Sequence, residues 1–112
     1  MTASAIITNL EKLLDGPRDG PLLRYSLGNE YLKAGEPARA AVYLRQAVER
    51  DPRQSAAWKL LGKALAEAGD PDAAQAAYRE GIAVAEGRGD IQAAREMKVF
   101  LKRLEKTQPD AG

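Results

Sequence analysis

Apolar residues recur at helical spacing along most of the chain. In PLLRYSLGNEYLKAG, which starts at residue 21, Leu23, Leu27 and Tyr31 stand at i, i+4 and i+8 and therefore share one helical face. The next segment, PARAAVYLRQAVERD, carries a second apolar stripe, formed by Ala40, Ala41, Leu44, Ala47 and Val48. The pattern predicts two consecutive amphipathic helices, of which the second stops at Asp51–Pro52.

The turn between these two helices occurs twice. AGEPARAA at 34–41 returns as AGDPDAAQ at 68–75, an offset of 34 residues. In each copy the glycine is typical of a helix end, where a left-handed residue is common. The acidic residue followed by proline is typical of a helix start, and Asp70 suits the N-cap better than Glu36. The doubled turn therefore predicts two copies of one helix–turn–helix unit.

The register extends beyond the turn. With the same offset, Leu27–Gly28 falls on Leu61–Gly62, and Ala40 falls on Ala74. The small residues stand where paired helices should cross, because a larger side chain would hold the axes beyond about 8–10 Å. We therefore expect Gly62→Val to overpack this crossing.

These residues resemble the tetratricopeptide repeat, a helix–turn–helix unit of about 34 residues with a W…LG…Y first helix and an A…F…A…P second helix. The second unit carries Trp58, Leu61, Gly62, Ala74 and Tyr78 at these places, and the first carries Leu27, Gly28, Tyr31, Ala40, Leu44, Ala47 and Pro52. The chain departs from the pattern at Arg24, where tryptophan usually stands. It departs again at the end of the second unit, which has no proline.

The resemblance covers 21–88 and implies an all-α fold within one domain over 1–112. Antiparallel helix–turn–helix repeats at 21–54 and 55–88 would stack as a short right-handed α-solenoid of about six helices. Stacked repeats leave an apolar face open at each end, so terminal helices must cap it. We expect an N-terminal capping helix at 2–15, docked through Ile6, Leu10 and Leu13.

The C-terminal flank predicts a second capping helix at 90–106, with Asp90 as its N-cap and a tail at 107–112. A strict register of 34 residues would put Arg95–Glu96 where Leu–Gly belongs. A shift of two residues puts Met97–Lys98 there, and the apolar character of Met97 favours this second register.

The amino-acid composition excludes several kinds of catalytic and metal site. The chain has neither cysteine nor histidine, which excludes disulfides, Cys/His metal sites and Ser–His or Cys–His catalysis. No phosphate loop or paired-carboxylate motif stands out, so we expect no enzyme and no cofactor or metal. The net charge of +1 gives no overall attraction to nucleic acid or to an anionic membrane. The first segment lacks signal-peptide features and no apolar run reaches membrane-spanning length, so we expect a cytoplasmic location.

Repeats that resemble these bind extended peptides or helices on a concave face lined by their first helices. The resemblance therefore implies a groove, and its basic and apolar lining favours a partner segment with acidic and apolar residues. The predicted site is Leu22, Tyr25, Asn29 and Lys33 from the first unit, Lys59 and Lys63 from the second, and Arg95, Val99 and Lys102 from the last helix; Leu32, Ala56, Leu60, Glu67 and Gln92 complete the lining.

One known subgroup of the family is excluded at this stage. Chaperone-binding members use a carboxylate clamp of Lys, Asn, Asn, Lys and Arg, of which only Asn29 is matched here. Tyr25 stands where the first lysine belongs, and Leu60 where the second asparagine belongs. We therefore do not expect binding of acidic chaperone tails.

Two alternatives to partner binding stay open. The chain could form a homodimer through the last helix, where Val99, Phe100 and Leu104 offer an apolar side. Nucleic-acid binding through the basic segment REMKVFLKRLEK is less favoured, since cations near a helix C-terminus are favourable in themselves.

Overall fold

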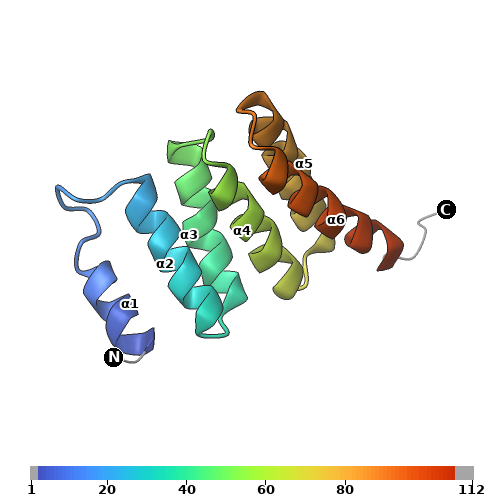
Figure 1. Ribbon diagram of the computed structural model, residues 1–112. Helices are drawn as coiled ribbons and strands as arrows, with labels where there is room; N and C mark the ends of the chain where they lie inside the picture. Colours follow the sequence, from blue (N-terminus) through green and yellow to red (C-terminus); the bar gives the residue numbers. More distant parts are fainter. Residues whose placement is uncertain (1–2, 108–112) are drawn as a thin grey trace.

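The computed structural model describes residues 3–107, and across this range the chain forms six helices joined by short turns (Figure 1). The helices are α1 (Ala3–Glu11), α2 (Pro21–Lys33), α3 (Pro37–Arg50), α4 (Ser55–Glu67), α5 (Pro71–Gly87) and α6 (Ile91–Thr107). Each helix packs against the next, and the row measures 46 × 29 × 22 Å. The fold is an all-α solenoid, as expected from the repeat. No helix in the described range combines the length and apolar character needed to cross a membrane.

The repeated turn has the expected geometry in both copies. Gly35 and Gly69 adopt φ of +77° and +85°, a left-handed conformation in which glycine carries no Cβ penalty. The N–H groups of Glu36 and Asp70 then bond back to the helices they leave, each at 2.9 Å. Asp70 also caps α5, because its Oδ1 accepts a hydrogen bond from the N–H of Ala73 at 3.2 Å, whereas Glu36 makes no such bond. The preference for aspartate over glutamate at this place is confirmed.

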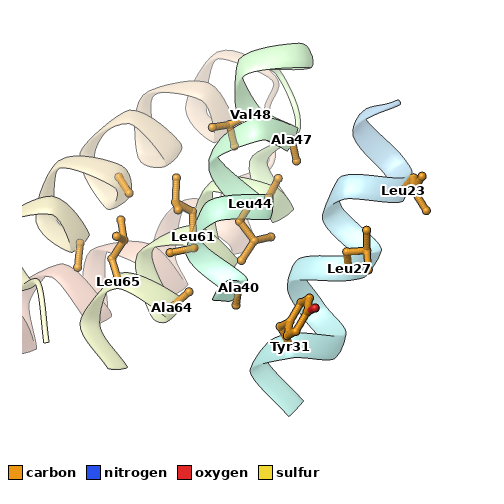
Figure 2. Packing of buried hydrophobic residues seen from close by; sticks show 14 of the residues in the cluster. Leu23, Leu27, Tyr31, Ala40, Leu44, Ala47, Val48, Leu61, Ala64 and Leu65 are labelled. Carbon is orange, nitrogen blue, oxygen red and sulfur yellow. The ribbon is translucent and has the colours of Figure 1, made fainter. Parts of the chain in front are cut away.

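The paired helices cross at glycine, as the small residues predicted. A Cβ added to Gly28 would lie 2.7 Å from Cδ2 of Leu44, and one added to Gly62 would lie 2.6 Å from Cζ of Tyr78. Leu27, Leu44 and Leu61 are fully buried at these crossings and form a continuous core between α2, α3 and α4 (Figure 2). Close helix approach therefore depends on the absence of a side chain at the two glycines.

Arg24 occupies the position where the repeat usually has tryptophan. Its side chain is 10% exposed. Its Nε donates to Oδ1 of Asp19 at 2.9 Å, and its Nη1 donates to Oε1 of Gln46 at 2.7 Å. The hydrogen bonds from Arg24, with a smaller contribution from the N–H of Asp15, lower the pKa of Asp19 from 3.8 to about 2. Where the repeat usually has a tryptophan side chain, Arg24 therefore forms an ion pair with Asp19 in the loop before α2.

The N-terminal capping helix differs from its expected bounds. It was expected to extend to residue 15, but α1 ends at Glu11 because the chain then enters a turn in which Asp15 has φ of +63°. Leu10 packs on the core as expected, whereas Ile7 and Leu14 take the places expected of Ile6 and Leu13. Leu13, expected to dock, is 37% exposed, because the turn after Glu11 breaks the helical register. Residue 2 lies outside the described range.

The C-terminal helix has the shifted register. α2, α4 and α6 begin at Pro21, Ser55 and Ile91, so the second interval exceeds the first by two residues. No proline ends the second unit, and α5 continues to Gly87; Gly89, with φ of +76°, lies in the turn that follows. Met97 is fully buried at the place of Leu61. The helix includes Thr107, and the rest of the predicted tail lies outside the described residues.

Candidate functional site

The nine predicted site residues all lie on α2, α4 and α6. These three helices are neighbours in one layer of the solenoid, while α3 and α5 lie behind them (Figure 1). The alternation of layers follows from the repeat itself, because each helix pair folds back on itself before the next pair begins. Residues that are up to 80 positions apart in the sequence are thereby gathered in one layer.

Exposure differs widely among these residues. Leu22 and Val99 are 70% and 48% exposed, and Tyr25 and Asn29 are half-buried. Four cations of the set are exposed: Lys33, Lys63, Arg95 and Lys102. Lys33 lies 3.5 Å from Oε1 of Glu30 on its own helix. The layer therefore offers isolated apolar side chains and exposed cations rather than one continuous apolar stripe.

A cavity of about 430 Å³ opens between α4, α5 and α6. Its lining is Lys59, Leu60, Lys63, Ala66, Glu67, Tyr78, Glu96 and Phe100. Of the nine site candidates, Lys59 and Lys63 line this cavity, together with Leu60 and Glu67 from the wider predicted lining. Leu22, Tyr25, Asn29, Lys33, Arg95, Val99 and Lys102 are not part of its lining. The volume lies at the lower end of the range of about 300–1,000 Å³ that is typical of ligand pockets.

The two lysines of the cavity differ in their pairing. Nζ of Lys59 lies 2.8 Å from Oε2 of Glu96 and so bridges α4 and α6. This contact is the main cause that lowers the pKa of Glu96, with a smaller contribution from Gln92. Lys63, one turn further along α4, forms no ion pair with any described residue and is exposed. The two side chains were expected to act together, but Lys59 is held in an ion pair and Lys63 has no ion-pair partner among the described residues.

Tyr78 is a cavity residue that the sequence did not reveal as such. Its ring lies over Gly62 and 5.8 Å from the ring of Phe100, and only 3% of the residue is exposed. Burial, with a smaller effect of the Glu67 charge, raises the pKa of Tyr78 to about 12. Tyr78 and Phe100 fill core positions of the repeat pattern, so the sequence indicated packing alone. They line the cavity because of the distance between α4 and α6, and a local sequence pattern gives no information on that distance.

The outward side of α6 is mainly charged. Lys98 stands at the position that Gly28 and Gly62 hold in α2 and α4, and its Nζ lies 2.8 Å from Oε2 of Glu86. Phe100 and Leu104, expected beside Val99 in one apolar patch, pack inward on the core formed by Tyr78, Ala85, Ala94 and Met97. Val99 and Ile91 are the large apolar side chains of α6 that are most exposed, at 48% and 53%.

A second cavity, of about 440 Å³, lies between α1, α2 and α3. Tyr31 and Tyr43 stack 5.6 Å apart in its wall, and both hydroxyls donate to Oε2 of Glu11, at 2.9 Å and 3.5 Å. Arg39 lies 5.8 Å from the centre of the Tyr31 ring. These polar groups satisfy one another and dock α1 on the first repeat, so we interpret this cluster as structural.

Comparison with known proteins identifies the family of this chain. A family model described as "Tetratricopeptide repeat" matches residues 25–91. The chain belongs to the tetratricopeptide repeat (TPR) family. This TPR protein is 48% identical over 103 residues to a TPR repeat-containing protein of Pseudomonas aeruginosa, in a match that spans 92% of this chain and 98% of the relative.

Solved structures agree with this assignment. The solution structure of a Bordetella parapertussis protein has a TM-score of 0.79 at 42% identity, over 95% of this chain and 90% of that one. The Sgt2 TPR domain from Aspergillus fumigatus has a TM-score of 0.73 at 25% identity, over 98% of this chain and 76% of that one. TPR domains bind other proteins and are generally non-catalytic.

One relative carries an enzyme's name. The beta-barrel assembly-enhancing protease of Escherichia coli is 34% identical over 98 residues. The matched segment is 84% of this chain but only 20% of the protease. The similarity thus concerns a limited part of that larger protein.

Proposed function

We propose that this TPR protein is a non-catalytic interaction module that binds a peptide or helix segment of another protein on the layer formed by α2, α4 and α6. The single observation that carries the proposal is the 430 Å³ cavity on this layer, where the free Lys63 stands beside Leu60, Ala66 and Phe100. Apolar side chains of a partner would be buried there, and acidic side chains would be attracted to the exposed cations. The expected cytoplasmic location stays a prediction.

Site-specific photo-crosslinking tests this proposal. A photoreactive amino acid would replace Leu22 on α2 or Ala56 on α4, both exposed, and Arg45 on α3 would serve as the control position. In lysate of the source organism we expect the same crosslinked protein from positions 22 and 56 and none from position 45. Crosslinks from position 45 alone, or none from the α2 and α4 positions, would contradict the proposed face.

Self-association through α6 is the second candidate. The observation that favours it is the exposure of Ile91 and Val99 on that helix. Light scattering coupled to size exclusion distinguishes the two candidates: a dimer that Val99→Asp converts to a monomer would support self-association. A monomeric wild type at high micromolar concentration would exclude a stable homodimer.

A further inference from the structure

The cavity between α4, α5 and α6 has features of a specific anchor pocket, and this inference rests on the proposed function. The formal charges of its lining sum to zero, two lysines against two glutamates: Lys59 is paired with Glu96 across the cavity, while Lys63 and Glu67 lie one turn apart on α4 without an ion pair. The remaining lining is Leu60, Ala66, Phe100 and the ring of Tyr78. A charged group that entered the cavity would lose its hydration without gaining a net opposite charge, so an uncharged group is favoured.

The hydroxyl of Tyr78 is the second observation. It makes no hydrogen bond with any described residue and is not one of the fully buried polar atoms, so it is open to the cavity, although the residue as a whole is only 3% exposed. A hydroxyl that faces a cavity without a partner in the chain is open to a hydrogen-bond acceptor that enters the cavity. Because its pKa of about 12 keeps it protonated at neutral pH, the hydroxyl is available as a donor.

We infer that this cavity binds one large uncharged apolar side chain of the partner segment, such as leucine or phenylalanine, while the Tyr78 hydroxyl donates a hydrogen bond to a carbonyl oxygen of the same segment. Acidic residues of the partner lie outside the cavity, where Lys63 reaches them from its rim. Tyr78 therefore acts as a recognition residue, in addition to its packing over Gly62.

Capped amino acids test this inference without a known partner. N-acetylphenylalanine methylamide and N-acetylleucine methylamide each carry an apolar side chain and carbonyl acceptors, and N-acetylaspartate methylamide is the charged counterpart. In ¹H–¹⁵N NMR titrations of the full chain we expect the two apolar probes to shift the amide signals of Ala66 and Phe100 in a saturable way. Saturable shifts by the aspartate probe alone, or by no probe at millimolar concentration, would overturn the inference.

Two variants separate recognition from folding. Tyr78→Phe keeps the ring and removes a hydroxyl that has no partner in the described chain, so we expect an unchanged or higher melting temperature. Because one hydrogen bond to the probe is lost, its affinity should fall about two- to tenfold. Tyr31→Phe is the matched control: it removes a hydroxyl that donates to Glu11 at 2.9 Å, so it should lower the melting temperature and leave probe affinity unchanged. Equal probe affinity in Tyr78→Phe and wild type would contradict the proposed hydrogen bond from the Tyr78 hydroxyl.

Ala66→Leu fills the cavity and should abolish the shifts at Phe100, while Lys106→Gln, at an exposed position of α6 outside the predicted site, should not alter them. Undiminished binding by a folded Ala66→Leu variant would overturn the location of the pocket. The result is independent of the crosslinking experiment. A protein that crosslinks at positions 22 and 56 while no probe binds would leave the interaction face in place and contradict only the anchor pocket.

Discussion

Glycines 28 and 62 determine how closely the helices of each repeat approach one another. Both stand under a large side chain of the facing helix, Leu44 in the first repeat and Tyr78 in the second. The same place in α6 is occupied by Lys98, which turns toward Glu86 of α5. A further helix packed on α6 as α3 packs on α2 would have to accommodate the Lys98 side chain in place of a glycine.

Gly62→Val should destabilise the protein by about 1–3 kcal/mol, because the new side chain overlaps the ring of Tyr78. Chemical unfolding measures the loss directly. Gly87→Val is the matched control, since a Cβ added at Gly87 meets no atom within 4 Å, and its effect should stay within about 1 kcal/mol. Equal loss of stability in both variants would show that the crossing is not the cause.

The ion pair of Arg24 and Asp19 makes stability depend on acid pH. The pKa of Asp19 is lowered from 3.8 to about 2 in the folded protein, so its contribution is complete above pH 3.8 and is lost as the pH falls toward 2. Urea midpoints measured from about pH 5 to about pH 2 should therefore fall more steeply for wild type than for Asp19→Asn. The exposed Glu49→Gln serves as the control, and its profile should follow wild type. Parallel profiles for all three proteins would exclude a role for this pair.

At the scale of the helices, most of the fold was accessible from the sequence because the signals are local. The 3.6-residue period, the left-handed glycine and the Asp/Glu–Pro start all act within one turn of the chain, and the structure confirms them. The bounds of α1 were predicted less well. The turn that follows α1 includes Asp15, whose N–H donates to the Asp19 carboxylate at 2.8 Å, and a contact between two loop residues leaves no helical pattern in the sequence.

The helix starts of α3 and α5 offer a matched test of capping. Asp70→Ala should destabilise the protein by about 0.5–2 kcal/mol, because α5 loses the side-chain bond to the N–H of Ala73. Glu36→Ala should have a smaller effect, since Glu36 makes no capping bond at the start of α3. Thermal or urea unfolding of the two variants measures the difference. A larger effect of Glu36→Ala would contradict the assigned caps.

At the scale of the whole molecule, the predicted site was only partly accessible from the sequence. The repeat register placed all nine candidates on α2, α4 and α6, but it gave no information on the spaces between these helices. Lys59 forms an ion pair with Glu96, which lies 37 residues away in the sequence. Tyr78 and Phe100 line the cavity only because of the distance between α4 and α6. Such features depend on tertiary distances, whereas the repeat pattern reports which side of a helix faces the core.

The central claim is that another protein binds the layer of α2, α4 and α6. The most direct measurement is a pull-down from lysate of the source organism, read by mass spectrometry, with wild type, Lys63→Glu and Lys59→Glu/Lys63→Glu. Arg45→Glu/Arg53→Glu, which reverses two exposed charges outside this layer, is the control, and melting curves confirm that each variant is folded. We predict a partner that wild type and control retain, that Lys63→Glu weakens and that the double variant loses. The same proteins captured by all four would contradict the claim.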